Sequence, residues 1–172
     1  FYEAALQMNG LKIRVVRTRK KPRLPLTDAM KIIAECRQPY RSIFEFMAWS
    51  GLGCDEFTEI QNSTELQADI ERQRKDETKN CIRIDLRPRK SNLDSFYTLV
   101  PKQFVPVFPF RTNVYGTKGG QLIDILDLEE SWTRACKRAK LYLVGRGPHS
   151  LRSAFRSTCA ESKVEDAVAE YC

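Results

Sequence analysis

The sequence predicts an α+β protein that is mainly α-helical and has a small antiparallel β-sheet. Apolar residues recur at helical spacing over residues 27–51 and again over residues 127–140. Between these regions, residues 81–87 alternate apolar and polar side chains, and a second short apolar run covers residues 96–100. An alternation with a period of two is typical of a half-buried strand. The two runs are therefore predicted to pair as a hairpin.

Two helices are predicted before the hairpin. Thr27 is the expected N-cap of the first, which runs toward Pro39. The second begins near Tyr40 and ends at Gly51, because glycine readily adopts the left-handed conformation that closes a helix. The buried faces are expected to consist of Met30, Ile33 and Ala34 in the first helix and of Ile43, Phe44, Phe46 and Met47 in the second. The second helix is too apolar to lie on the surface.

The remaining segments are polar or are interrupted by proline and glycine. In chain order they are predicted to be the tail of a preceding helix that stops at Asn9-Gly10 (1–10), a short helix (55–60), an exposed loop or solvent-exposed helix (62–80), a mostly irregular stretch (101–125), a helix that starts near Pro148, and another helix (164–171).

Length and cysteine content set the class of protein. The 172 residues are enough for one domain with a full core. No apolar run approaches the roughly 20 residues that cross a bilayer, and residues 1–10 do not have the pattern of a signal peptide, so no membrane contact is expected.

The six cysteines include no C-x-x-C pair, which gives no indication of a zinc site or a disulfide framework. We expect reduced thiols in a cytosolic protein and no metal or cofactor. The first residue, Phe, suggests part of a longer protein.

The positive charge of the chain is concentrated in residues 11–23, called the basic arm below. This arm contains seven Lys or Arg and no acid, whereas the whole chain has 29 bases, 22 acids and a net charge of +7. The rest of the chain is therefore neutral. The arm suits a polyanion, because each basic side chain placed on a phosphate releases a counterion, although a solvated linker explains it equally well. The candidate phosphate-binding residues in the arm are Arg17, Arg19, Lys20, Lys21 and Arg23.

Residues 148–156 carry the strongest chemical signal. Pro148 suits the first turn of a helix, so that His149 and Arg152 fall three residues apart on one face, with Arg156 a turn further on. The arginine fork can donate two parallel hydrogen bonds to a phosphate, and the imidazole can donate a third or carry a proton. The alternative interpretation is an amphipathic helix with a solvated basic edge.

Three short segments follow one another along the chain: FMAWSGLGCDEF at residues 46–57, RPRKS at 87–91 and GPHSLRSAF at 147–155. In this order and spacing they resemble the catalytic domain of the tyrosine recombinases, the phage-integrase family. The first is similar to the family's first box (T-G-L-R-x-x-E-L), the second lies where the family has a hairpin with a catalytic lysine, and the third resembles the second box (H-x-L-R-H-x-F). The resemblance covers nearly all of residues 26–172, and residues 1–25 would then be the end of a preceding domain and a basic linker.

The resemblance implies site-specific recombination, in which double-stranded DNA is cut and rejoined through a 3′-phosphotyrosyl intermediate without a metal or cofactor. Lys90 would protonate the departing 5′ oxygen, Arg152 would hold the non-bridging phosphate oxygens, and His149 would act as hydrogen-bond partner or proton carrier. The basic arm and Arg156 would contact DNA. The family also implies a tetramer on DNA and a cytoplasmic, nucleoid-associated protein of a prokaryote, virus or plasmid.

Two departures from the family pattern leave the activity open. Gly53 stands where the first box has a phosphate-binding arginine, although the acidic residue of the box, Glu56, is present. The family's tyrosine nucleophile lies well beyond the second box, and Tyr171 comes too early to match it, so the chain is expected to lack the C-terminal tail. Three interpretations follow: an integrase in which Arg41, Arg146 or Arg156 replaces the missing arginine, a catalytically degenerate DNA-binding protein, or an unrelated helical domain.

Overall fold

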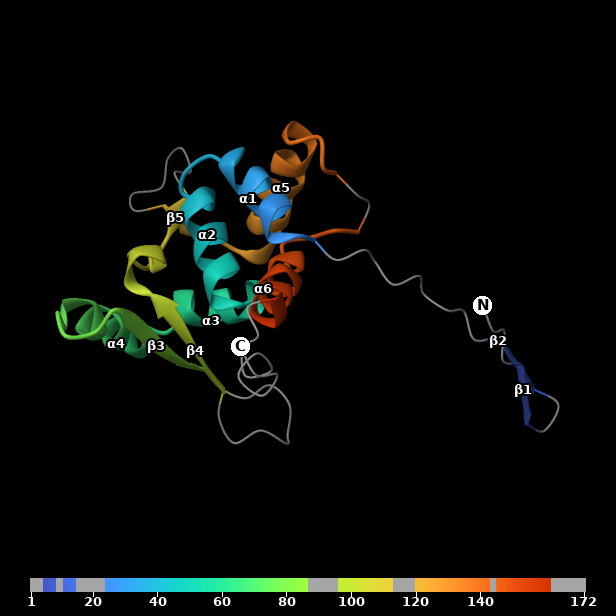
Figure 1. Cartoon of the computed structure of the whole chain (residues 1–172), viewed down its shortest axis with the longest axis horizontal. Coiled ribbons are helices and arrows are strands. Elements are labelled where there is room, and N and C mark those ends of the chain that lie inside the picture. Colours follow the sequence, from blue (N-terminus) through green and yellow to red (C-terminus); the bar gives the residue numbers. More distant parts are fainter. Residues whose placement is uncertain are drawn as a thin grey trace.

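The computed structural model describes residues 5–8, 11–14, 24–86, 96–112, 120–142 and 145–161. These residues form six α-helices and three two-stranded antiparallel sheets (Figure 1). The helices are α1 (Leu26–Ala34), α2 (Tyr40–Ser50), α3 (Cys54–Asn62), α4 (Thr64–Lys75), α5 (Ile125–Arg138) and α6 (Ser150–Glu161). The sheets pair β1 (Ala5–Met8) with β2 (Leu11–Arg14), β3 (Cys81–Leu86) with β4 (Phe96–Pro101), and β5 (Arg111–Thr112) with β6 (Gln121–Leu122). The predicted fold class is confirmed.

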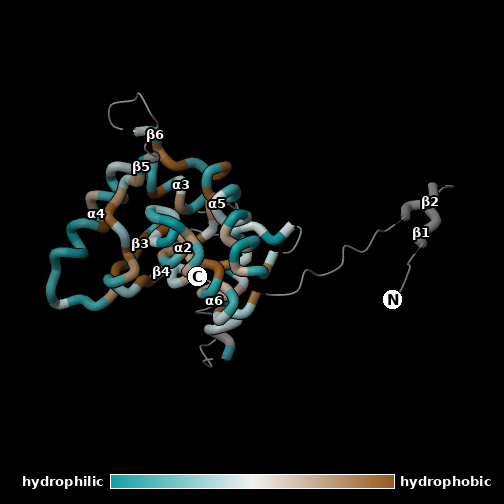
Figure 2. The backbone as a smooth tube through the Cα atoms, turned by 90° about the horizontal axis from the view of Figure 1, so that it is seen from above, coloured by the Kyte–Doolittle hydropathy of each residue, from teal (hydrophilic) through white to brown (hydrophobic). Residues whose placement is uncertain are grey.

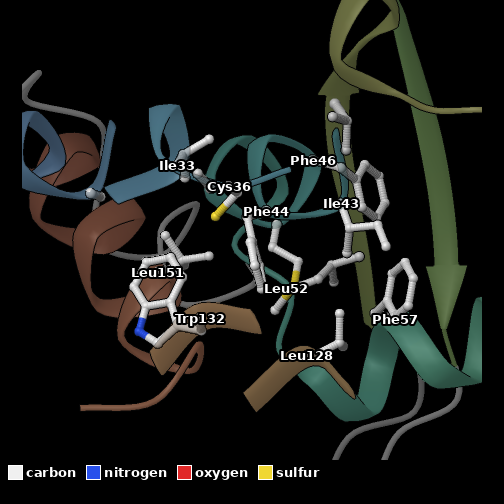
Figure 3. Close-up of a cluster of buried hydrophobic side chains, with 14 of the residues drawn as sticks. Ile33, Cys36, Ile43, Phe44, Phe46, Leu52, Phe57, Leu128, Trp132 and Leu151 are labelled. Carbon is white, nitrogen blue, oxygen red and sulfur yellow. The ribbon is translucent and has the colours of Figure 1, made fainter. Parts of the chain in front are cut away.

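Helix α2 lies at the centre of the fold. It buries the four predicted residues Ile43, Phe44, Phe46 and Met47, and in addition Ala48 and Ser50. Helices α1 and α6 and strand β4 all pack against it. Figure 3 shows Phe44 beside Trp132 of α5, with ring centroids 5.2 Å apart and the rings 71° from parallel. An edge-to-face aromatic pair of this kind contributes about 0.5–1.5 kcal/mol beyond the burial of its area.

Helix α1 differs from the prediction at its start and in its buried face. It begins at Leu26 with Pro25 as N-cap, so Thr27 lies inside the first turn and is not the cap. Its buried residues are Ala29, Ile32 and Ile33, whereas Ala34 is exposed. Two overlapping apolar stripes at helical spacing are present in this stretch of sequence. Packing against α2 and α6 buries Ile33 as predicted and leaves Met30 only partly buried, while Ala29 and Ile32 take the other core positions.

Strands β3 and β4 form the predicted hairpin. The register runs from the Cys81–Pro101 pair to the Leu86–Phe96 pair. Every second residue of β3 is buried, and the others are exposed, as the alternation indicated. Residues 87–95, which include the predicted hairpin turn and Lys90, lie outside the described residues.

A buried hydrogen bond connects this hairpin to α2. The Oγ1 of Thr98 donates to the carbonyl of Ser50 at 2.7 Å, and both residues are fully buried. The hydroxyl of Ser50 in turn accepts the backbone N–H of Leu52 at 3.3 Å. The middle of strand β4 is therefore bonded to the same short segment that leads from α2 into α3.

The prediction for the N-terminus is wrong where the structure describes it. Met8 pairs with Leu11 in an antiparallel hairpin, so residues 5–8 are a strand rather than a helix, and residues 11–14 of the basic arm are its partner. The intervening dipeptide Asn-Gly, interpreted as a helix stop, is equally typical of two-residue hairpin connections. The rest of the basic arm, with Arg17, Arg19, Lys20, Lys21 and Arg23, lies outside the described residues.

The middle of the chain follows the predictions more closely. Helix α3 covers the predicted short helix and continues to Asn62. The polar stretch after it contains α4, the second of the two alternatives considered, and Ile70 is its buried residue. Figure 2 shows α4 as a mostly hydrophilic element beside β3. The short β5–β6 pair interrupts the stretch that was expected to be mostly irregular.

Helix α5 lies across α1 and α3 and completes the core. It starts at Ile125, because the side chain of Asp124 accepts the backbone N–H of Asp127 at 2.9 Å. Leu128, Trp132 and Ala135, which recur at helical spacing within the predicted helix over residues 127–140, are buried. The helix expected over residues 164–171 lies outside the described residues. None of the helices in the described ranges combines the length and the apolar character that a membrane span requires.

We expect Thr98→Val to lower the free energy of unfolding by about 1–3 kcal/mol, because the buried Ser50 carbonyl loses its donor. Urea denaturation followed by circular dichroism measures this loss. Thr98→Ser is the matched control, since it keeps the hydroxyl and removes only a methyl group, at a cost of about 1 kcal/mol. A loss in the valine variant no larger than in the serine variant would contradict the role of the hydrogen bond.

Candidate functional site

The candidate site lies where the beginning of α3 meets the beginning of α6. Helix α2 ends at Gly51, whose φ of 69° is in the left-handed region that favours glycine. The chain then passes through the fully buried Leu52 and enters α3 at Gly53, the N-cap. On the other side of the contact, Pro148 and Leu151 are buried and anchor the first turn of α6.

Glu56 closes the first turn of α3. Its Oε2 accepts the backbone N–H of Gly53 at 2.9 Å. This is the half of a capping box in which the third helical residue satisfies the donor of the N-cap. The partial positive charge of a helix N-terminus also favours a carboxylate here. The second carboxylate oxygen remains available to a partner from another element.

Arg152 is that partner. Its Nη1 donates to Oε1 of Glu56 at 3.2 Å, although the two residues are 96 positions apart in the chain. The side chain of Arg152 is 24% exposed and that of Glu56 is 14% exposed. The pair is therefore largely shielded from water and is screened less by salt than a surface pair. The two segments that carry the sequence motifs meet at this ion pair.

His149 borders the same place, but it is not part of the helix. Helix α6 begins at Ser150, whose backbone N–H and hydroxyl both donate to the carbonyl of Gly147, at 3.0 and 2.7 Å. The prediction that His149 and Arg152 share a helical face is therefore corrected, because this turn ends just after the histidine. The imidazole is nevertheless close to the start of α3: a Cβ at Gly53 would lie 3.3 Å from its Nδ1.

Gly53 has an ordinary backbone conformation, but there is little room for a side chain at this position. Its φ of −94° and ψ of −179° describe extended backbone that any residue adopts. A Cβ at this position would lie 2.8 Å from Oε2 of Glu56 in addition to its close approach to His149. A side chain here would have to displace the carboxylate. The missing first-box arginine is thus associated with a close approach of Glu56 and His149 to the backbone.

The structure distinguishes among the three arginines considered as replacements. Arg41 lies in the first turn of α2, at the end away from Gly53, and donates to the carbonyl of Ala34 at 3.2 Å. Arg146 lies near α5: its backbone carbonyl accepts Nε1 of Trp132 at 3.2 Å, and its positive charge opposes the burial that raises the pKa of Cys136 to about 11. Arg156 is exposed and lies one helical turn beyond Arg152 on the same face of α6. Of the three, Arg156 is the one that shares a helix with Arg152.

Among the predicted site residues, the structure brings His149 and Arg152 to one place, with Arg156 on the adjacent turn. Lys90 lies in residues 87–95, outside the described residues, as do the five basic-arm candidates. The contact of Glu56 with Arg152 was not predicted. Its position three residues after the start of a helix indicates a capping role in the sequence, but nothing in the sequence indicates a partner from α6.

The first residue of α3, Cys54, reports on the charges around the site. Burial raises the pKa of its thiol from 9.0 to about 12. The negative charge of Glu129 is the next largest cause, and Asp55 and Glu56 act in the same direction. Acidic side chains from α3 and α5 therefore face this edge of the site. Because the thiol is neutral near pH 7, it does not act as a nucleophile there. Within the part of the chain that the structure describes, no cluster of His, Cys, Asp and Glu could hold a metal ion.

Comparison with solved structures identifies the fold. The XerH site-specific recombinase bound to its difH substrate, in a pre-cleavage complex, superposes with a TM-score of 0.61 and 13% identity over 96% of this chain and 51% of that chain. Its post-cleavage complex with a palindromic difH substrate superposes with a TM-score of 0.61 and 12% identity, over 87% of this chain and 45% of that chain. A variant of the Tn1549 transposon integrase with a circular intermediate DNA superposes with a TM-score of 0.57 and 14% identity, over 91% of this chain and 59% of that chain.

These neighbours are tyrosine recombinases, and the fold of this chain is the one they share. At such low identity the likeness is one of fold. The chain spans about half the length of the XerH chains it matches. No family model matches the sequence, and no curated protein matches it.

We expect the stability of the protein to fall above pH 9, in part because of Cys54. Its folded pKa of about 12 lies above the ordinary value of 9.0, so its contribution is complete below pH 9.0 and is lost as the pH rises toward 12. Urea unfolding at successive pH values measures the loss, and Cys54→Ala should reduce its slope. Iodoacetamide at mildly alkaline pH should label the exposed Cys81 well before Cys54. Equal labelling rates would contradict the burial of the Cys54 thiol.

Proposed function

We propose that this protein is a site-specific DNA recombinase of the tyrosine class, which cuts and rejoins double-stranded DNA through a 3′-phosphotyrosyl intermediate. In this proposal, residues 26–172 belong to the catalytic domain and residues 1–25 to a basic linker that follows another domain. The observation that carries the proposal is the contact between Arg152 and Glu56. It joins the two family-like boxes at one point, in a fold that superposes on recombinases bound to DNA.

The chemistry of the proposed site uses fixed hydrogen-bond donors. The phosphodiester passes through a pentavalent arrangement with negative charge on its equatorial oxygens. Arg152 binds these oxygens, and His149 donates to them or carries a proton. Lys90 protonates the departing 5′ oxygen. Donors held in place before the reaction lower the barrier because they need no reorganisation when the charge develops.

The proposed partners are double-stranded DNA and further copies of the same chain. Arg156 extends the donor surface of α6 by one turn. The five residues Arg17, Arg19, Lys20, Lys21 and Arg23 would bind phosphates on either side of the reacting one. A tetramer on DNA would bring together the four strands that recombination exchanges.

We expect Arg152→Gln to reduce relaxation of supercoiled plasmid DNA by about 10²–10³-fold, because removing one donor to the developing negative charge has an effect of this size. The assay uses the protein encoded by the complete reading frame, since the nucleophilic tyrosine is expected downstream of the second box. Arg72→Gln is the matched control, as it removes an equal charge from exposed α4. Unchanged relaxation in the Arg152 variant would refute the proposed role.

A second candidate function is that of a DNA-binding protein that has lost catalysis. The observation in its favour is Gly53, which removes the first-box arginine. In that case the wild-type protein binds DNA without relaxing it, and Lys90→Ala leaves biological activity unchanged. Gly53→Arg separates the two candidates further. A gain of relaxation on this substitution indicates a degenerate active site, whereas a loss from an active wild type indicates that Glu56 and His149 need the space.

We expect the triple reversal of Arg19, Lys20 and Lys21 to glutamate to weaken binding to all duplex sequences by similar factors. The dependence of log affinity on log salt concentration should become shallower by about 0.9 for each phosphate contact that is lost. Fluorescence anisotropy at several salt concentrations measures both effects. The control reverses Arg72, Lys75 and Lys79, which changes the net charge equally at the exposed end of α4. Equal effects of the two triple variants would contradict a specific role of the arm.

A further inference from the structure

The carboxylate of Glu56 makes two polar contacts with groups that bind anions. One oxygen accepts the N–H of Gly53 at 2.9 Å, and the other accepts Nη1 of Arg152 at 3.2 Å. A backbone N–H at a helix N-terminus and an arginine guanidinium are the two kinds of donor that proteins most often offer to phosphate. In this structure a side chain of the protein itself lies between them.

The surroundings of the pair do not favour a second, external anion while Glu56 remains in place. Asp55 and Glu56 on α3 and Glu129 on α5 are close enough to raise the pKa of Cys54. The cations on α6 are Arg152, which pairs with Glu56, and the exposed Arg156. His149 adds a donor at the border of the cluster without a permanent charge. Two arginines therefore stand against three carboxylates in this part of the structure.

Gly53 leaves room for the carboxylate to lie close to the backbone. An arginine here would supply a second guanidinium beside Glu56, and its Cβ would fall 2.8 Å from Oε2. With glycine, the carboxylate lies directly against the backbone and has Arg152 as its cationic partner. Where the family's first box has a second guanidinium, this chain has a carboxylate in close contact with the backbone and with Arg152.

We propose that Glu56 competes with phosphate for Arg152, so that a DNA phosphate has to displace this carboxylate in order to bind. The inference rests on the proposed function, which supplies the phosphate, and adds a control of access to the site. DNA held in register by contacts elsewhere displaces Glu56, because the phosphate is then present at high effective concentration. A phosphate that is not held in this way competes poorly with the intramolecular carboxylate. Glu56 therefore discriminates between bound duplex and free anions.

The test is a double-mutant cycle between Glu56→Gln and Arg152→Gln, with a fluorescein-labelled duplex of random sequence as the probe. Glutamine is chosen because its carbonyl can still accept the N–H of Gly53, which preserves the start of α3. We expect Glu56→Gln to tighten binding about fivefold, which corresponds to about 1 kcal/mol, in the range of a partly shielded ion pair. In the Arg152→Gln background, the same change should have no more effect than Glu65→Gln. That control removes one carboxylate from exposed α4.

Each outcome decides between the inference and the function on which it rests. Weaker binding by Glu56→Gln, in a protein whose affinity depends on Arg152, would overturn competition and make Glu56 a positioning residue. Equal tightening in both backgrounds would also overturn it, since the effect would then be general electrostatics. An affinity that does not change on Arg152→Gln would instead refute Arg152 as the phosphate ligand, and the proposed function would lose its main support.

Discussion

The burial of α2 on nearly all of its sides is the constraint on which the other elements depend. Its side chains are covered by α1 and α6, by β4, and by Trp132 from α5. Because the helix must end where its apolar sequence ends, Gly51 turns the chain and sends Leu52 back into the core. The start of α3 is therefore placed by the packing of α2. The Thr98–Ser50 hydrogen bond connects the middle of the β3–β4 hairpin to the same segment. The first-box segment and the hairpin are thus held by one buried element.

The second consequence of this packing is electrostatic. An ion pair removed from water is favourable only when its geometry is good and its remaining atoms are satisfied. Glu56 meets this condition, since one oxygen is bonded to the backbone and the other to Arg152. The pair stabilises the approach of α3 to α6, but it also commits the arginine to an internal partner. The ion pair that stabilises the site in the absence of DNA is therefore the same contact that an incoming anion has to compete with. The carboxylate in this contact is the one that lies close to Gly53.

The elements that the sequence predicts well are those whose signal is local and unambiguous. The period of two in residues 81–86, the apolar helix that ends at Gly51 and the stripe of α5 all appear where expected. Errors occur where one local pattern permits two structures. Asn9-Gly10 suits both a helix stop and a hairpin, and the stretch around Ala29 and Met30 contains two possible buried stripes. In such cases partners distant in the sequence make the choice.

The same division applies to the site. The chain alone indicated which segments are candidates for the site, because the order of the family-like boxes and the spacing of His149 and Arg152 are properties of the linear polymer. The cap that Glu56 forms on Gly53 is an interaction over three residues, so a local pattern could have indicated it, although it was not predicted. The pairing of Glu56 with Arg152, the start of α6 after His149 and the crowding around Gly53 depend on folding. The contact between Glu56 and Arg152 joins residues 96 positions apart, and no local pattern encodes it.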